Sequence, residues 1–420
     1  MTAADGARRD HRAIGRRLDI YAIEPEVGRG LVLWPPNGEA LRATIGRVWR
    51  RFHSAAGYRF VDTPRVAKAQ LWDTSGHLAS HGDELFPQLE LHGERHIVTP
   101  ANCPLHMVLY RRMRPSWRDL PVRFAELSTI HREEPSGSLR GLFRVRSVTQ
   151  DDGHIFCRVE EAEDEIVRLL ALSRELLAAF GFTNIELYLG TGGEKAIGDT
   201  RLWDRATSIL RLALDRLDVP FEERPGDATF YAPRIGGDVV DARGTRWPLP
   251  DLQLDLQLPE RCGLTFVATS GDPERPAVLH RTVIGSLERF IAALLEHYDG
   301  RLPGWLAPVQ VVALPIRPEH RPFAERVVEY LAAHGSRAIA RPADHSLAAR
   351  VRAATDEGVP CLAIIGDAEL ARSHVRVRWS ARDQETMPPE RLAQALQLRF
   401  AEPAPRAFSP QWEETGRCSH

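Results

Sequence analysis

The sequence predicts an α+β protein, with a large antiparallel sheet flanked by helices and a small α/β domain after it. Three observations lead to this prediction. Before residue 300, strand-like runs joined by a long turn are mixed with isolated amphipathic helices. The Pro- and Gly-rich segment GRLPGWLAP (300–308) then interrupts the chain. After it, short apolar strands alternate with helices, which is typical of a mostly parallel sheet.

The first part opens with a helix and three extended runs. Residues 38–57 predict a helix, because Leu41, Ile45, Val48, Trp49 and Phe52 recur at helical spacing. The extended run YRFVDTP (58–64) follows and stops at its proline. Two strands, 123–130 and 142–157, flank the turn-rich HREEPSGSLRG. Strands joined by such a loop pair antiparallel, since a parallel pair needs a longer crossover.

The remainder of the first part adds two helices and three strands. Residues 160–180 predict a helix with an apolar stripe, and Gly181 is suited to the position after its C-cap. A last helix is predicted at 284–298. The three strands are IELYL (185–189), QLDLQL (253–258) and LTFVA (264–268).

We therefore predict a first domain over residues 1–303, an α/β domain over 304–400 and a flexible tail over 401–420. The elements of the second domain alternate between strand and helix: strand VQVVAL, helix 319–334, strand RAIA, helix 346–357, and strands CLAIIGD and HVRVRW. The tail is rich in proline, serine and charge, which is typical of mobile ends.

Composition indicates a soluble, cytoplasmic protein without a membrane anchor. Of 420 residues, 43% are hydrophobic and 27% are charged, which is ordinary for a soluble protein. The net charge is −2, so the protein has no overall positive charge that would indicate nucleic-acid binding, although local basic patches can still bind nucleic acid. The five cysteines are scattered without a CxxC pair, which fits a reducing compartment. No signal-peptide core and no apolar run near the ~18 residues of a membrane span is present.

The stretch TQDDGHIFC (149–157) places Asp151, Asp152 and His154 beside an apolar pair. In a strand, Gln150, Asp152 and His154 point to one face. Buried charge is costly unless it is paired, hydrogen-bonded or bound to a metal. Two interpretations remain from these residues alone, an exposed edge strand or a functional site.

Arginines gather in two further stretches. Arg132, Arg140, Arg144 and Arg146 lie in or just after HREEPSGSLRG, and Arg289 lies one turn into the last helix. Guanidinium groups suit carboxylates and phosphates. A solvated basic hairpin and a surface helix arginine are the alternative interpretations.

Taken together, these stretches resemble class II aminoacyl-tRNA synthetases, and specifically the threonyl family. HREEPSGSLRGLFRVRSVTQDDGHIF resembles the second class motif and LHRTVIGSLERF the third, while YRFVDTP stands where the first motif forms a dimer interface. ANCPLHM, ATFYAPRIG, QLDLQLP and WLAPVQVV are similar to family segments in order and spacing. The similarity runs from Asp10 to about residue 400.

The resemblance implies a zinc ion in the threonine pocket. Its ligands would be Cys103, His154 and His280, three protein groups that leave one coordination position open. Asp152 would accept from the ammonium group of threonine. Gln150, Tyr231 and Gln253 match the remaining pocket positions.

The resemblance also implies an ATP site with Mg²⁺. Arg132 would hold the α-phosphate and the threonine carboxylate, Glu134 would meet the adenine amino group, and Arg144 and Arg289 would bind the outer phosphates. Arg132 and Arg289 would thus be the catalytic pair. The chain departs from the family at Val148, where an aromatic residue usually stacks on adenine, and at residues 248–251.

The second domain resembles the anticodon-binding domain of the threonyl, prolyl, histidyl and glycyl enzymes. Glu369 and Arg378 would be anticodon contacts. Phosphate contacts are expected from about half of a set of arginines: Arg341, Arg350, Arg352, Arg372, Arg376 and Arg378.

The expected function is therefore ATP-dependent activation of L-threonine and its transfer to tRNA(Thr) by a homodimer. A short form is also expected, without the N-terminal TGS and editing domains, because the family's catalytic helix begins near Asp10. Two alternatives remain: a ligase that delivers threonine to a carrier protein or small molecule, and a non-catalytic paralogue that binds tRNA or adenylates.

Overall fold

The structure, a computed structural model, describes residues 10–81, 85–193 and 196–406. Within these ranges the chain forms two compact units. The smaller unit takes residues 10–22, 33–48 and 294–403, and the larger takes residues 23–32, 49–293 and 404–406. The predicted domain boundaries at 303 and 400 stay predictions, and residues 407–420 of the predicted tail lie outside the described residues.

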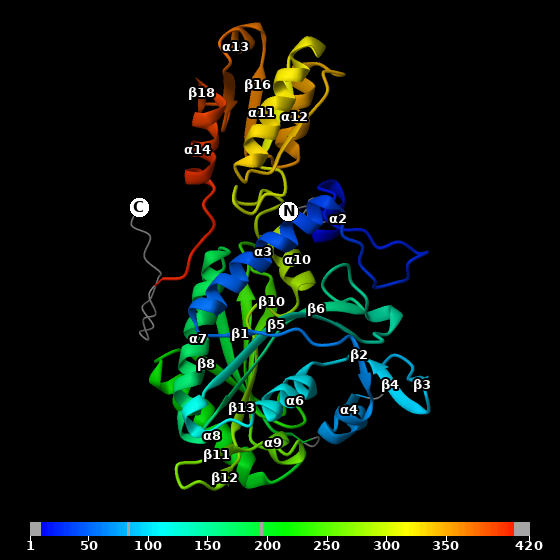
Figure 1. The fold of residues 1–420 in the computed structure, drawn as a ribbon, viewed down its shortest axis with the longest axis vertical. Coiled ribbons are helices and arrows are strands. Elements are labelled where there is room, and N and C mark those ends of the chain that lie inside the picture. The colour runs from blue at the N-terminus through cyan, green and yellow to red at the C-terminus, as the bar shows by residue number, and fades with distance from the viewer. Residues whose placement is uncertain (1–9, 82–84, 194–195, 407–420) are drawn as a thin grey trace. The chain divides into compact units, whose positions relative to one another are not determined.

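The larger unit is built on an eight-stranded sheet with the order β1-β5-β6-β13-β10-β9-β7-β8 (Figure 1). Neighbouring strands are antiparallel except for β1 with β5 and β7 with β8, which are parallel. The predicted α+β class with a large antiparallel sheet is confirmed. The strands are β1 (Arg59–Phe60), β5 (Val122–His131), β6 (Ser147–Cys157), β7 (Ile185–Thr191), β8 (Phe221–Pro225), β9 (Arg234–Val240), β10 (Arg246–Asp255) and β13 (Ala277–Thr282).

The hairpin of β5 and β6 is the longest pairing of the sheet. Its register runs from Val122 opposite Phe156 to His131 opposite Ser147. The prediction that β6 begins at residue 142 is wrong, because the chain first turns back on itself and Arg140 N–H donates to the Arg144 carbonyl at 3.2 Å. The edge-strand interpretation is also wrong: β6 lies between β5 and β13, and residues 151–157 are all buried.

Two other predicted strands have different bounds. The strand predicted at 253–258 is β10, which begins at Arg246 and ends at Asp255. It ends there because the Asp255 carboxylate accepts from the N–H groups of Gln257 and Leu258 and starts helix α9 (Leu258–Arg261). The strand predicted at 264–268 shrinks to β11 (Phe266–Val267), which pairs with β12 (Pro273–Glu274) outside the main sheet.

Helices cover this sheet at several strands. α7 (Ala162–Ala179) and α8 (Thr200–Arg216) pack together and contact strands β7, β9, β10 and β13. The predicted 160–180 helix is α7 preceded by a short 3₁₀ turn, and Gly181 follows its C-cap with φ 93°, as expected. α6 (Cys103–Met113) packs on β6, where the rings of Tyr110 and Phe156 stack with centroids 4.3 Å apart. Neither α6 nor α8 was predicted.

The helices predicted at 38–57 and 284–298 are α3 (Pro36–Ala55) and α10 (Leu287–His297). The five apolar positions that predicted α3 are all buried. A small three-stranded sheet, with the order β2-β4-β3, lies in the segment between α3 and α6. Its elements and the helices beside it are β2 (Val66–Lys68), α4 (Gln70–Ser75), α5 (His77–His81), β3 (Leu89–Leu91) and β4 (Glu94–Val98).

The smaller unit contains a five-stranded sheet with the order β15-β14-β16-β17-β18. A mostly parallel sheet was predicted: β15, β14 and β16 do pair parallel, whereas β17 and the unpredicted β18 pair antiparallel. Helix α2 (His11–Arg17) also belongs to this unit. The other elements are β14 (Val311–Pro315), α11 (Arg321–Ala333), β15 (Ala338–Ala340), α12 (Leu347–Asp356), β16 (Cys361–Ile365), α13 (Asp367–Ala371), β17 (Val375–Arg378), β18 (Gln384–Met387) and α14 (Pro389–Arg399).

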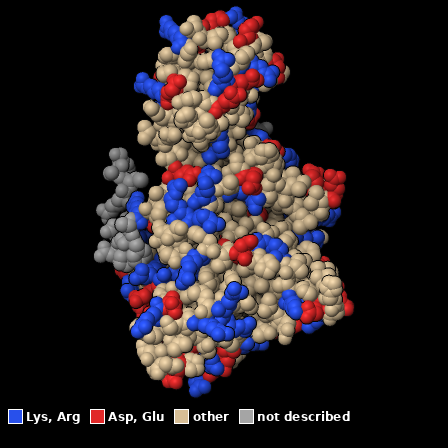
Figure 2. All heavy atoms as spheres, in the orientation of Figure 1, with Lys and Arg blue, Asp and Glu red and all other residues tan. Residues whose placement is uncertain are grey.

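Surface charge is mixed in sign. On the face drawn in Figure 2, Lys and Arg side chains alternate with Asp and Glu, in keeping with the net charge of −2. Positive charge is therefore available only in local groups on that face. Among the described residues, no helix is long and apolar enough to cross a membrane.

Candidate active site

Three neighbouring strands place polar side chains in one row across the sheet. His154 on β6 is opposite His280 on β13, and His280 is opposite Gln253 on β10. Asp152 and Gln150 follow His154 at two-residue intervals, so they lie on the same face of β6. A row of this kind requires long-range strand pairing, because its members lie far apart in the sequence.

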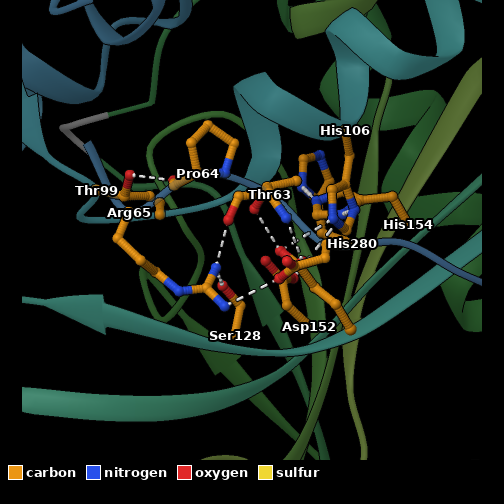
Figure 3. A network of polar contacts seen from close by, with 12 residues as sticks. Thr63, Pro64, Arg65, Thr99, His106, Ser128, Asp152, His154 and His280 are labelled. Carbon is orange, nitrogen blue, oxygen red and sulfur yellow. Dashed lines mark hydrogen bonds and ion pairs between the residues drawn. The ribbon is translucent and has the colours of Figure 1, made fainter. Parts of the chain in front are cut away.

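Cys103 completes a group of three possible metal ligands. It is the first residue of α6, and one ligand atom from each of Cys103, His154 and His280 lies within 4.8 Å of the other two. His154 Nε2 and His280 Nδ1 are 3.0 Å apart (Figure 3). Two nitrogen ligands of one tetrahedral zinc are separated by about 3.3 Å, given Zn–N bonds of about 2.0–2.1 Å. The donor set and the spacing of the two nitrogens therefore fit a zinc ion.

The surroundings keep these groups in defined protonation states. Burial, followed by the nearby charges of His280 and His106, lowers the pKa of His154 well below its ordinary value, so the ring is neutral, as a ligand must be. Burial raises the pKa of the Cys103 thiol well above its ordinary value. A thiolate at this position would therefore need a compensating cation.

Asp152 lies beside this group. Only 5% of Asp152 is exposed, and its Oδ1 is 3.8 Å from His154 Nδ1. Burial raises the pKa of Asp152, an effect that the neighbouring His106 only partly offsets. A buried carboxylate in this condition would gain from a cationic ligand group.

The other residues predicted to bind threonine lie close to the histidines. The Tyr231 ring centroid is 4.9 Å from that of His280, and the Tyr231 hydroxyl donates a hydrogen bond to Gln253 Oε1. Gln253 Nε2 donates in turn to Asp251. Gln150 forms an isolated β-bridge with Ser286, just before α10. These contacts fix Tyr231 and Gln253 relative to the histidine row.

The predicted ATP-binding arginines form a second group. Burial, and then the nearby positive charges of Arg144 and Arg132, lower the pKa of Arg289. Arg289 also donates to the carbonyls of Phe143 and Pro248, at 3.3 and 3.1 Å. Repulsion among three such cations would be relieved by a polyanion.

Glu134 and Val148 lie near these arginines in sequence and fold. Glu134 is buried, and its Oε2 accepts from Arg144 Nε at 2.7 Å. Val148 is partly buried on β6, four residues before Asp152 and on the same face. It therefore presents an aliphatic side chain where an aromatic ring was expected from the family.

The arginines proposed to contact tRNA have different surroundings. Arg350 is only 4% exposed, and its guanidinium donates to the carbonyls of Pro315 and His345. The enclosed side chain speaks against a phosphate contact by Arg350, and contacts were expected from only about half of this set. Arg376 Nε is 3.5 Å from Glu369 Oε1, and the Glu369 carboxylate also accepts from Gly366 N–H. Arg378 lies on β17 opposite Gln384.

The other face of β6 holds a buried ion pair that the sequence did not reveal. Asp151 and Arg281 are both buried, and Arg281 Nη1 donates to Asp151 Oδ1. Asp151 also accepts from Trp49 Nε1 and from the backbone N–H groups of Val283 and Ile284. Burial alone would raise the pKa of Asp151, but Arg281, His53 and the two backbone donors outweigh it and lower the pKa below its ordinary value.

Gly153 leaves space for this arginine. It is paired with Arg281 across β6 and β13, and a Cβ at Gly153 would lie 2.4 Å from the guanidinium carbon. Such an approach is far inside van der Waals contact, so a glycine is required for the observed packing.

Three more polar residues of the site were missed. His106 is hydrogen-bonded to His154, and Asp255 is hydrogen-bonded to His280. The ring of His77 packs against that of Phe230, with centroids 5.3 Å apart. The sequence carried a weak signal for one of them, since His106 lies three residues after Cys103 and thus on the same helical face.

Comparisons with known proteins agree with this geometry. The family model described as the tRNA synthetase class II core domain (G, H, P, S and T) matches residues 88–298, and the anticodon binding domain model matches residues 310–399. The fold and the site thus define a class II aminoacyl-tRNA synthetase core followed by an anticodon-binding domain.

Relatives narrow this class. The chain is 44% identical to a chloroplastic/mitochondrial threonine–tRNA ligase of Arabidopsis thaliana and 42% identical to the threonine–tRNA ligase of Nitrosococcus oceani, in each case over 89% of its own length. It superposes on the RNA binding domain of threonyl-tRNA synthetase from Cryptosporidium parvum Iowa II with a TM-score of 0.90, at 30% identity and over 94% of this chain and 99% of that one. The chain belongs to the threonyl-tRNA synthetase family, as its motifs predicted. It spans 57% and 58% of the length of the two curated relatives.

Proposed function

We propose that the protein activates L-threonine with ATP and transfers it to tRNA(Thr). The observation that carries this proposal is the row of His154, His280 and Gln253, which lies with Cys103, Asp152 and Tyr231 in one cluster, and Arg132 is near enough to act on Cys103. Family membership supports the same reaction. Neither the histidine cluster nor the arginines alone would account for binding of both an amino acid and a nucleotide.

Cys103, His154 and His280 would hold zinc, and the metal would supply an open Lewis-acid position for the amino and hydroxyl groups of threonine. Asp152 would accept from the ammonium group, which suits a buried carboxylate whose pKa is raised by burial. Tyr231 and Gln253 would close the pocket through their mutual hydrogen bond. Gln150 would lie at the edge toward the nucleotide.

The arginines would bind ATP and orient the reaction. Arg132 would hold the α-phosphate and the threonine carboxylate in line, and a carboxylate oxygen would attack the α-phosphorus while pyrophosphate leaves. Arg289 and Arg144 would bind the outer phosphates together with Mg²⁺, and Glu134 would accept from the adenine amino group. In the second step a ribose hydroxyl of tRNA would attack the acyl carbon and AMP would leave. Positioning and charge stabilisation can supply most of such catalysis.

Partners and assembly belong to the same proposal. The protein would act as a cytoplasmic homodimer, with the segment 58–64 at the two-fold interface and Glu369 and Arg378 at the anticodon. Analytical ultracentrifugation at micromolar concentration should give twice the 47.1 kDa of the chain. A monomer alone would contradict the dimer.

Two assays test the reaction itself. Threonine-dependent pyrophosphate exchange reports activation, and formation of threonyl-tRNA reports transfer. We expect both with the wild type, and loss of both in Cys103→Ala. Exchange without transfer would favour delivery to a carrier, and absence of both would favour a non-catalytic paralogue.

Selectivity between amino acids tests the proposed threonine pocket. Valine lacks the hydroxyl, and sites built for a hydroxyl reject such analogues by factors of ~10⁴–10⁵. Serine lacks only a methyl group, which is worth about 10- to 200-fold. The pure protein should therefore charge serine measurably and valine undetectably. Rapid loss of seryl-tRNA with this protein alone would reveal an editing activity.

A further inference from the structure

The histidine row continues beyond the three candidate ligands. His280 Nε2 is 3.0 Å from Asp255 Oδ2, so this ligand has a carboxylate behind it. Such a partner is usual for a metal-binding histidine, because it fixes the ring and its tautomer. His154 has a different arrangement, since its outer nitrogen faces another histidine, with His154 Nδ1 2.7 Å from His106 Nδ1.

Only one proton arrangement suits this contact. If His154 Nε2 faces the metal, Nδ1 must carry the proton and donate it to His106 Nδ1. His106 must then carry its own proton on Nε2. That nitrogen is 3.4 Å from Glu126 Oε1, and His106 is 0% and Glu126 4% exposed. Solvent therefore has little access to stabilise any other tautomer.

Glu126 is itself fixed in place. Thr63 donates to both of its oxygens, from the hydroxyl to Oε1 at 2.6 Å and from the backbone N–H to Oε2 at 3.0 Å. Arg65 holds this segment by donating to the Thr63 carbonyl and to Ser128 Oγ. Figure 3 shows the network, with the three histidines at one end and Arg65 and Thr99 at the other.

We infer that His106 and Glu126 are positioning residues that set the tautomer and ring orientation of His154, so that its Nε2 lone pair faces Cys103 and His280. The contact order is Thr63, Glu126, His106, His154. This inference rests on the proposed zinc site but concerns two residues outside its ligand set. Neither His106 nor Glu126 would touch the metal.

Zinc affinity measures this role directly, by competition with a chromogenic chelator. His106→Leu removes the acceptor for His154 Nδ1–H and should weaken zinc binding about 10- to 100-fold, as loss of such an outer partner typically does. Glu126→Gln should weaken it less, because the amide still fills the space. Thr63→Val, which removes only the hydroxyl, should have the smallest effect.

Two conservative variants separate positioning from packing. The amide oxygen of Asn can take the place of His Nδ1, whereas the amide of Gln takes the place of Nε2. His106→Asn should therefore recover much of the zinc affinity lost in His106→Leu, and His106→Gln should not. A role in packing alone would favour Gln, whose volume is closer to that of His.

His320 provides a matched control in the smaller unit. It is also buried, and its Nε2 is 3.0 Å from Asp367 Oδ1, but it lies far from the ligands in the sequence and belongs to a 3₁₀ turn (Pro318–His320) of the other unit. His320→Asn should leave zinc affinity unchanged. The visible ligand-field bands of the Co²⁺-substituted protein provide a second readout, and they should shift in His106→Gln and stay near wild type in His106→Asn.

The outcomes distinguish this inference from the proposed function. If the wild type binds one zinc that Cys103→Ala loses, while His106→Leu, His106→Asn and His106→Gln all bind zinc as tightly as the wild type, the positioning role is overturned and the zinc site stands. If the wild type binds no zinc, both are overturned. Should His106→Leu fail to fold, the Asn and Gln pair decides, and equal affinity in these two would overturn the inference.

Discussion

The two faces of strand β6 carry adjacent aspartates with opposite chemistry. Asp151 accepts four hydrogen bonds, from Arg281, Trp49 and two backbone N–H groups, and its pKa is lowered. Asp152, one residue later, is equally enclosed, yet its pKa is raised. The difference shows that burial alone does not define a structural carboxylate. On one face the protein itself stabilises the ionised carboxylate, and on the other, burial disfavours it.

The largest expected effect is a loss of stability when the buried ion pair of Asp151 and Arg281 is broken. Arg281→Met leaves the Asp151 carboxylate buried without its cation, which should lower the free energy of unfolding by about 3–5 kcal/mol. Chemical denaturation measures this change. The exposed pair of Arg201 and Asp199 in the same unit is the control, since Arg201→Met should change stability little. A similar small loss in both variants would contradict the comparison.

The same substitution at the two aspartates should give opposite results. Asp152→Asn should lower kcat/KM for threonine activation at least about 30-fold, because loss of one partner of an enclosed charge pair costs about 2 kcal/mol or more. Its unfolding free energy should stay near that of the wild type. Asp151→Asn should instead destabilise the protein. Pyrophosphate exchange and denaturation of both variants decide the question, and an active, stable Asp152→Asn protein would remove this residue from the site.

Acid should lower the stability of the protein by protonating Asp151. Its pKa is lower in the folded state than the ordinary value of 3.8, so the stability it contributes is present above that value and is lost as the pH falls through the folded pKa. Asp151→Asn lacks this group, so its stability should fall less steeply with acid. The difference between the two denaturation curves isolates the contribution of Asp151. Parallel curves would argue against the lowered pKa.

The smallest expected effect is a change in the KM for ATP when Val148 is replaced by an aromatic residue. Val148 lies on the side of β6 that carries Asp152, and Val148→Phe should restore an aromatic surface for adenine. A stacking contact is worth about 0.5–1.5 kcal/mol, so the KM for ATP should fall about 2- to 10-fold. Val148→Leu is the size control without a ring. An unchanged or higher KM in the phenylalanine variant would show that adenine does not stack there.

Much of the fold was predictable from the sequence because its strong local signals agree with the tertiary structure. The apolar stripes of α3 and α7 and the β5–β6 hairpin follow from periodicity and turn residues. α8 was missed although Trp203, Ala206, Leu210, Ala213 and Leu214 recur at helical spacing and are buried. Strand ends were less predictable, because contacts such as the Asp255 cap depend on side chains that only the fold brings together.

The candidate site also contains residues that the sequence predicted and residues that only the fold reveals. The residues proposed as ligands were reached through family motifs, since Cys103, His154 and His280 are too far apart in the sequence for a spacing rule. The contacts behind them, from His106, Glu126 and Thr63, follow from strand register and a helix position. Apart from the spacing of His106 from Cys103, no local pattern indicates them, because each residue taken alone resembles an ordinary buried polar group.

Gly153 has a consequence for how this strand can change over generations. Any side chain there would push into the buried Arg281 guanidinium, and moving that group aside would disturb its ion pair with Asp151. A lineage that replaced the glycine first would pass through a destabilised protein, and one that lost the arginine first would strand a buried carboxylate. The three positions should therefore vary together or remain fixed. A deep mutational scan would detect this as strong epistasis between neighbouring strands.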